Sequence, residues 1–197
     1  MKVFVRRAPL KVTLRWCQRT LFAVAALALG YCAFAGTNVL IFQHSGSKSF
    51  DQQLLSQTKG ASAPEMGTDG IIGRIEIPRL GVSTLLVEGT AESALERAAG
   101  HIVGTALPGH RGNVGIAAHR DSFFRPLRNI RREDVITLAT LKGEYRYRVV
   151  SIDVVGPEDV SVLEGNDMEM LTLVTCYPFY FVGPAPSRFI VRAKRLV

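Results

Sequence analysis

The chain has 197 residues, with 24 basic and 17 acidic side chains and a net charge of +7 at neutral pH. Six of the basic residues and no acidic one lie in residues 1–19, which leaves 18 basic against 17 acidic side chains in the remainder. The length predicts one ordinary domain with an appendage. Because the positive charge is confined to one end, the composition excludes a folded part that binds nucleic acid through a broadly basic surface.

The basic end is followed by an uncharged apolar segment, residues 20–42. A helix of that length would be about 34 Å long, which is enough to cross a bilayer. The positive flank predicts residues 1–19 as a cytoplasmic tail, residues 20–42 as a transmembrane signal anchor, and an exported remainder. The alternative is a cleaved signal peptide, because Ala33-Phe34-Ala35 fits a cleavage site. The apolar run continues to Phe42, which favours a retained anchor in the cytoplasmic membrane.

Residues 43–69 are rich in Ser, Gly, Gln and Ala, and this composition predicts a flexible stalk. One short piece of it, Phe50 to Leu55, has a helical pattern. Residues 70–197 are long enough to bury a core of their own and are expected to form the catalytic domain.

Within residues 70–197, short runs that alternate in polarity or are rich in β-branched residues predict strands. Only residues 91–99 and 122–129 have helical patterns. Many short strands with few helices predict a mainly β fold, either a barrel or a sandwich. The expected strands are Ile71–Ile77, Val82–Val87, Val114–Ala118, Val135–Leu138, Glu144–Val155, Met170–Thr175 and Arg188–Leu196.

Cysteine usage directs attention to Cys176, since the other two cysteines, Cys17 and Cys32, lie in the tail and the apolar segment. An unpaired thiol in an exported domain is either reactive or a buried small hydrophobe. Cys176 follows one predicted strand, His119 follows another, and Arg188 opens the last. A thiol, an imidazole and a guanidinium are the groups that covalent acyl transfer requires. The spacing alone leaves a loop histidine and a solvated strand arginine as alternatives.

A zinc site is the competing interpretation of the histidines. His101, His110 and His119 recur every nine residues, and Cys176 would complete a tetrahedral set. Structural zinc ligands usually come in closely spaced pairs, which these histidines do not form. The sequence therefore predicts neither a metal nor a cofactor.

Three segments together resemble the sortases, the cysteine transpeptidases of bacterial surfaces. They are residues 112–121 (GNVGIAAHRD), residues 172–176 (TLVTC) and residues 187–191 (SRFIV). The resemblance covers residues 70–197 and the anchor that precedes them. The segment from Tyr177 to Pro186 is most similar to the class D-like branch. Ala118 departs from the many relatives that have glycine before the histidine.

The resemblance implies an eight-stranded sortase-type β-barrel with short helices, preceded by an N-terminal transmembrane helix. It also implies that Cys176 attacks the Thr–Gly bond of an LPxTG-like sorting signal near the C-terminus of an exported protein. His119 would protonate the departing amine, and Arg188 would steady the carbonyl oxygen. An amine acceptor on a cell-wall peptide or another protein would then resolve the thioester.

The walls of the substrate groove are expected near the nucleophile. Thr175, Tyr177 and Pro178 flank Cys176 and are predicted to contact the substrate, and Asp121 is predicted to orient His119. The connection from Tyr177 to Pro186 either shapes the substrate channel or closes the barrel rigidly. Two other functions stay open: a cysteine hydrolase in which water resolves the acyl-enzyme, and a non-catalytic surface β-domain with a structural cysteine.

Overall fold

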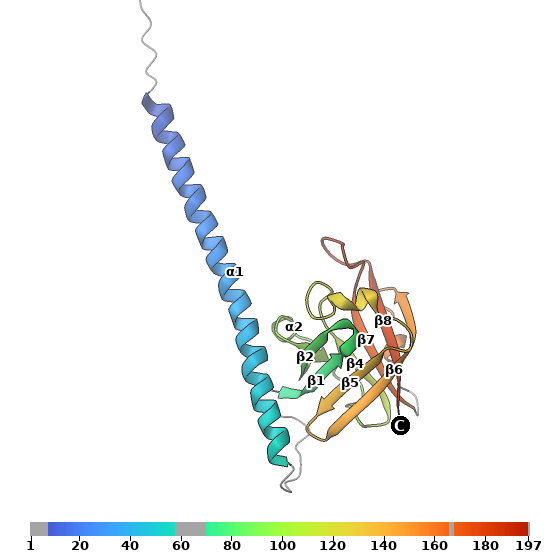
Figure 1. Ribbon diagram of the computed structural model, residues 1–197. Coiled ribbons are helices and arrows are strands. Elements are labelled where there is room, and N and C mark those ends of the chain that lie inside the picture. The colour runs from blue at the N-terminus through green and yellow to red at the C-terminus, as the bar shows by residue number, and fades with distance from the viewer. Residues whose placement is uncertain (1–7, 58–69, 166–167, 197) are drawn as a thin grey trace, which may run out of the picture. The chain divides into compact units, whose positions relative to one another are not determined.

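The computed structural model describes residues 8–57, 70–165 and 168–196 (Figure 1). The chain divides into two compact units, residues 1–41 and residues 42–197. The elements are α1 (Ala8–Gln57), β1 (Ile71–Ile77), η2 (Pro78–Leu80), β2 (Val82–Glu88), α2 (Glu92–Leu95), β3 (Ala99–His101), β4 (Gly112–Ala117), η3 (Arg125–Asn129), β5 (Val135–Thr140), β6 (Gly143–Val155), η4 (Ser161–Leu163), β7 (Glu169–Tyr177) and β8 (Ser187–Arg195).

The first unit contains most of α1. Large apolar side chains along it, such as Leu21, Leu27 and Leu40, are about 70% exposed. By length and composition this helix could span a membrane. An exposed apolar surface of this extent is what a lipid environment would cover. The boundaries of the cytoplasmic tail and of the anchor stay predictions.

The predicted flexible stalk is wrong for residues 43–57, which continue α1 as a helix. Phe50 is only 2% exposed and packs with Ile71 and Leu85 of the barrel. The Gln43 side-chain amide donates hydrogen bonds to Thr84 Oγ1 (3.0 Å) and the Arg97 carbonyl (2.6 Å). Burial of these side chains outweighs a composition typical of linkers. The rest of the predicted stalk, residues 58–69, lies outside the described residues.

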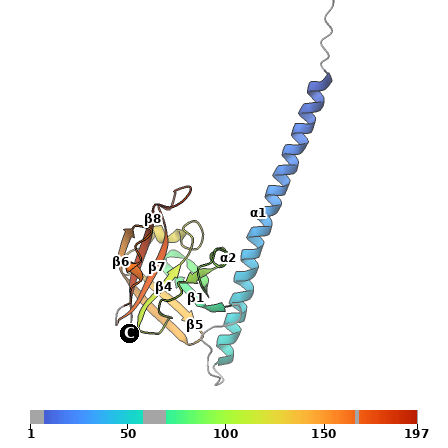
Figure 2. The same ribbon diagram turned by 180° about the vertical axis from the view of Figure 1, so that it is seen from behind.

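The second unit is built on a closed barrel of eight strands, in the order β1-β2-β3-β4-β7-β8-β6-β5 (Figure 2). Two neighbouring pairs, β2–β3 and β4–β7, are parallel, and the other pairs are antiparallel. Gly73 lies where β1 meets β5, and a Cβ at this position would collide with the Ala139 carbonyl oxygen. The expected eight-stranded β-barrel with few helices is confirmed.

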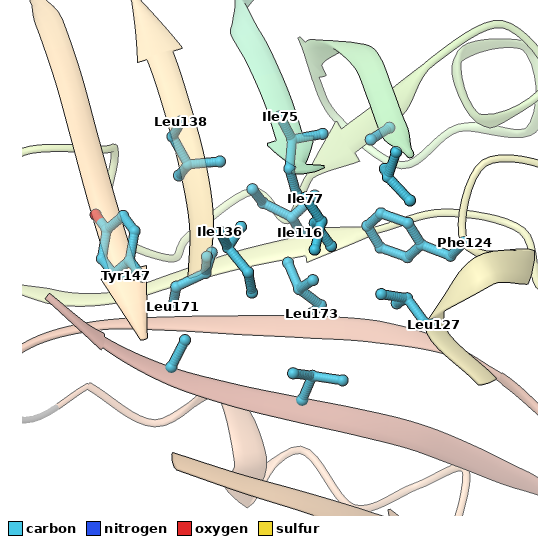
Figure 3. Close-up of a cluster of buried hydrophobic side chains, with 14 of the residues drawn as sticks. Ile75, Ile77, Ile116, Phe124, Leu127, Ile136, Leu138, Tyr147, Leu171 and Leu173 are labelled. Atoms are coloured by element: carbon cyan, nitrogen blue, oxygen red, sulfur yellow. The ribbon is translucent and has the colours of Figure 1, made fainter. Parts of the chain in front are cut away.

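The barrel interior is filled by alternating side chains from the strands (Figure 3). Ile75 and Ile77 of β1, Ile116 of β4, and Leu171 and Leu173 of β7 are all fully buried there. Because successive residues of a strand face opposite sides, this set also fixes which residues of each strand face outward.

The structure differs from the expected elements at two connections. The predicted helix over residues 91–99 is the four-residue α2, and β3 follows it. β3 has only three residues and no β-branched side chain, so its sequence lacks a strand pattern. Gly100 in β3 permits a close approach, since a Cβ there would collide with the Gly89 carbonyl oxygen. The predicted helix over residues 122–129 is the 3-10 turn η3.

An arginine–carboxylate pair joins the β1–β2 connection to the β4–β5 connection. Arg79 hydrogen-bonds both carboxylate oxygens of Asp134, and the Asp134 side chain is only 7% exposed. Arg79 also donates to the Asn129 carbonyl (2.6 Å), and the Arg131 backbone N–H donates to Asp134 (2.7 Å). The hydrogen bond from Arg79 is the largest cause that lowers the pKa of Asp134.

Candidate active site

Cys176 and Arg188 are direct neighbours on the outer surface of the barrel. In β7 the buried Leu171 and Leu173 face inward, so Cys176 faces outward. The antiparallel register pairs Cys176 with Arg188 of β8. Opposed residues of such a pair have Cβ atoms about 4.5–5.5 Å apart. The sequence placed these two residues at strand ends, and the register brings their side chains to one place.

His119 is brought to the same end of the barrel by the parallel pairing of β4 with β7. The Ala118 backbone N–H donates to the Val174 carbonyl (3.3 Å), and the Thr175 hydroxyl donates to the Ala118 carbonyl (2.7 Å). The residue before His119 is therefore hydrogen-bonded to the residue before Cys176. The thiol and the guanidinium come from β7 and β8, and the imidazole lies two residues after β4, the strand beside β7 in the sheet order.

Thr175 has a different place from the one predicted for it. Its side chain is 3% exposed and donates a hydrogen bond to the Ala118 carbonyl, so it lies below the surface. Its residue type in the TLVTC segment indicated importance, but not this function. The hydrogen bond joins β7 to the backbone that leads to His119.

The carboxylate near His119 is Glu92, which sequence reasoning missed. His119 Nε2 lies 3.7 Å from Glu92 Oε1, at the start of α2. In the described part of the chain, Asp121, the predicted orienting residue, makes no such ion pair with His119. The Glu92 side chain is 79% exposed, and an exposed pair of this kind stabilises a structure only weakly. No sequence pattern connects residues 92 and 119, because only the fold brings them together.

The Arg188 side chain is held at the start of β8 by hydrogen bonds to nearby backbone carbonyls. Its guanidinium donates to the carbonyls of Ala185 (3.3 Å) and Ser187 (3.2 Å). A guanidinium has five N–H donors, so donors remain for a ligand beside Cys176. Arg188 is half-buried, and this burial limits the access of water to its guanidinium.

The β7–β8 connection has a packed base and an exposed tip. Tyr177 stacks on Phe189 of β8 with ring centroids 6.0 Å apart, and Phe179 meets Phe189 edge-on at 5.1 Å. These rings close the end of the barrel. Pro178 contributes its carbonyl as the acceptor for Arg120 (3.1 Å). Substrate contact by Tyr177 and Pro178 remains a prediction, and of the two interpretations of this connection the packing supports barrel closure for its base.

A polar pocket of about 250 Å³ lies on the same outer surface, four residues along β7 from Cys176. Four residues of a strand span about 13 Å. The Thr172 hydroxyl donates to Asn113 Oδ1 (2.8 Å), and the Asn113 amide donates to the Val162 carbonyl (3.1 Å). These bonds hold the β6–β7 connection over the pocket. No sequence pattern indicates this pocket, because its walls come from distant segments. The lining residues are Asn113, Ser161, Glu164, Gly165, Met170, Thr172 and Arg192.

The histidines of the zinc alternative do not come together. His101 is 2% exposed, with Nδ1 2.9 Å from Glu88 Oε2 and Nε2 3.0 Å from the Ala106 carbonyl. Its ring is therefore occupied by structural hydrogen bonds between β2 and the β3–β4 connection. Among the described residues, no three His, Cys, Asp or Glu side chains are grouped so that they could hold a metal ion.

A closed barrel with a thiol, a guanidinium and an imidazole at one end of its outer surface has the features of a cysteine-dependent acyl-transfer enzyme. A family model described as "Sortase domain" matches residues 75–196. The chain is 34% identical over 153 residues to Sortase D of Bacillus subtilis strain 168, covering 77% of this chain and 75% of that protein. It is 29% identical over 127 residues to Sortase A of Listeria monocytogenes, covering 62% of this chain and 56% of that protein.

The solved structures agree with the sequence comparisons. A Clostridium perfringens Sortase D5 transpeptidase has a TM-score of 0.62 and 30% identity to this chain, covering 79% of this chain and 96% of that one. The chain therefore belongs to the sortase family and is a cysteine transpeptidase.

Proposed function

We propose that Cys176 is the nucleophile of this sortase, that His119 transfers the protons, and that Arg188 binds the carbonyl oxygen of the substrate. The observation that supports these assignments is the register. Cys176 and Arg188 are opposed on the outer surface, and Ala118 and Thr175 are joined by a hydrogen bond directly beneath. Groups placed on or just after paired strands are held in position before substrate binds, as covalent catalysis requires.

The reaction follows from these assignments. The Cys176 thiolate attacks the carbonyl carbon of the Thr–Gly bond, and Arg188 stabilises the negative oxygen of the tetrahedral intermediate. The C–N bond breaks, and the glycine amine leaves with a proton from the His119 imidazolium. A thioester remains on Cys176. An incoming amine attacks it and gives its proton to His119, and the C–S bond breaks to regenerate the thiolate.

The substrate is an exported protein with an LPxTG-like sorting signal near its C-terminus, and the acceptor is an amine of a cell-wall peptide or of another protein. The pocket beside Thr172 lies about four strand residues from Cys176, a distance that suits the upstream end of an extended signal. Tyr177 and Pro178 contact the signal at the nucleophile.

The N-terminus stays in the cytoplasm, and the barrel lies outside the cytoplasmic membrane. Residues 1–19 contain six basic side chains and no acidic one, and such a flank is retained on the cytoplasmic side. The segment from residue 20 to residue 42 is the retained anchor. Residues 43–57 continue α1 and pack on the barrel.

The test uses the full chain in detergent with Cys17 and Cys32 replaced by serine, so that Cys176 is the remaining thiol. Wild type and Cys176→Ala are incubated with a library of LPxTG-like peptides and an amine acceptor, and intact masses are measured. We expect an acyl adduct only when Cys176 is present, and its conversion to an amide product. We expect Arg188→Lys to lower kcat/KM by about tenfold or more, since lysine lacks the planar fork. The control Arg148→Lys, on exposed β6, should stay near wild type.

The other outcomes separate the rivals. Hydrolysis despite abundant acceptor would establish the cysteine hydrolase. A Cys176 that resists alkylation until the protein unfolds, with no adduct, would establish the structural cysteine. An alkylatable Cys176 with no adduct would contradict the proposed signal but not the proposed nucleophile.

A further inference from the structure

The tip of the β7–β8 connection exposes three consecutive large apolar side chains. Val182 is 95% exposed, Tyr180 is 76% exposed and Phe181 is 45% exposed. In Figures 1 and 2 this connection projects beyond the ends of β7 and β8. Single exposed apolar residues are ordinary, but a contiguous group of this kind marks an interaction surface.

The tip is held outward. Arg120 donates to the carbonyls of Pro178 (3.1 Å) and Gly183 (2.9 Å), which lie on either side of the apolar residues. Arg128 donates to the Tyr180 hydroxyl (2.6 Å), and its guanidinium lies over the Tyr180 ring at 5.6 Å. The connection is therefore fastened at its base and along its side, and its apolar end stays in solvent.

The surroundings of the tip are basic. The segment from residue 118 to residue 133, which fastens the tip, contains five arginines against two carboxylates. Arg125 and Arg128 are exposed. Aromatic and aliphatic side chains flanked by arginine suit the interface of a bilayer, where the apolar part enters the acyl boundary and the cations meet anionic headgroups.

Phe42 is linked to the neighbourhood of His119 through Arg97 and α2. Phe42 is the last residue of the apolar segment, and the Arg97 guanidinium covers its ring at 4.9 Å. Arg97 lies two residues after the end of α2, and Glu92 at the start of α2 lies 3.7 Å from His119. Arg120, which fastens the tip, follows His119 in the chain.

We propose that Tyr180, Phe181 and Val182, with Arg125 and Arg128, dock into the headgroup region of the membrane in which the chain is anchored. This inference rests on the proposed transmembrane anchor and adds a second, peripheral contact with the same bilayer. Docking holds the mouth of the active site at a fixed height above the lipid surface. A sorting signal would then be captured within reach of the bilayer rather than at any distance from it.

The test measures lipid contact directly, in the full chain. Trp16 is the single native tryptophan, and it lies beside the apolar segment, so it reports insertion of the anchor. A Trp16→Phe, Val182→Trp variant reports docking of the tip. The matched control is Trp16→Phe, Val150→Trp. Val150 is 41% exposed on β6, five residues from the strand end that pairs with Arg188, which is a separation of about 16 Å.

Each protein is reconstituted in vesicles of equal parts phosphatidylcholine and phosphatidylglycerol, with and without brominated acyl chains. We expect bromine to quench the Val182→Trp reporter by about twofold or more, with a blue-shifted emission, while the Val150→Trp control keeps a water-like spectrum. Quenching of the Val182→Trp reporter should weaken in phosphatidylcholine alone, because the arginines lose their anionic partners.

The failures are distinguishable. If bromine quenches native Trp16 but does not quench the Val182→Trp reporter, docking of the tip is overturned and the anchor is supported. Native Trp16 unquenched in the wild type overturns the anchor and docking together. A Val182→Trp emission that changes only when a peptide substrate or an amine acceptor is added assigns the tip to a peptide partner and also overturns the proposal.

Discussion

Two parts of the barrel wall differ in the side chains that face outward and in what packs on them. On β1 and β2 the outward residues Ile71, Leu85 and Val87 are apolar, and residues 42–57 of α1 cover them. On β4, β7 and β8 the corresponding outer surface contains Cys176 and Arg188 and, in the described part of the chain, is contacted near Thr172 by the 3-10 turn η4 rather than by α1. A covered wall is buried on both sides and contributes to stability, whereas an open wall leaves groups free for a ligand. The polarity of the outward-facing side chains, more than the place of a strand in the barrel, therefore distinguishes the structural wall from the functional one.

The largest stability effect that tests this comparison is expected at the covered wall. Phe50→Ala removes a ring that is 2% exposed between α1 and the barrel, so it should lower the free energy of unfolding by about 3–5 kcal/mol. Denaturant unfolding of the full chain in detergent measures it. The control Leu55→Ala, at a side chain 72% exposed on the same helix, should change the free energy by less than about 0.5 kcal/mol. Equal effects at both positions would mean that the helix does not cover the barrel in solution.

The next largest effect, on stability and on kcat, is expected at the open wall. Thr175→Val keeps the shape of the side chain but leaves the buried Ala118 carbonyl without its 2.7 Å hydrogen bond, at a cost of about 1–3 kcal/mol. Because that bond positions the backbone before His119, kcat should fall by roughly tenfold while KM changes little. Thr175→Ser, which keeps the hydroxyl, should restore kcat. A loss of stability with no change in kcat would show that Thr175 does not position the site.

Seven of the eight strands were predictable because each leaves a local signal, whereas the three candidate catalytic residues were brought together only by the resemblance to a family. Alternation marks β7, and Cys176 is the one cysteine beyond the apolar segment. The cover over β1 and β2 also leaves a signal, although only a strand was predicted from it. Leu85, Leu86 and Val87 are apolar in succession, and such a run is typical of a strand that is buried on both sides.

The remaining features depend on contacts between distant segments. Glu92 reaches His119, and Thr175 reaches Ala118, only through the pairing of whole strands. Gln43 anchors its helix through Thr84, a partner 41 residues away. No periodicity encodes such a pairing, because it follows from closure of the barrel rather than from any local preference. β3 was not predicted for the same reason, because it is a strand only through its pairing with β2 and β4.

The smallest effect on stability is expected at the ion pair that connects the two walls. Arg79 comes from the β1–β2 connection, and Asp134 from the segment that begins at His119 and ends at β5. Asp134→Asn should lower the melting temperature by a few degrees at neutral pH, because the neutral amide cannot replace a carboxylate bonded by Arg79 and the Arg131 N–H. Thermal unfolding of wild type and variant across a pH series measures the difference.

The pH dependence gives this prediction its sign. The pKa of Asp134 is lowered in the folded protein, chiefly by the hydrogen bond from Arg79, so its carboxylate stabilises the fold at every pH above the unfolded value of about 3.9. The stabilisation is lost as the pH falls through the folded pKa, and the wild-type and variant curves should then converge. The control Asp153→Asn, at an exposed carboxylate of β6, should show no such convergence. If the Asp134→Asn difference persisted undiminished at acid pH, the charge of Asp134 would not be what holds the two connections together, and the covered and open walls would be joined by packing alone.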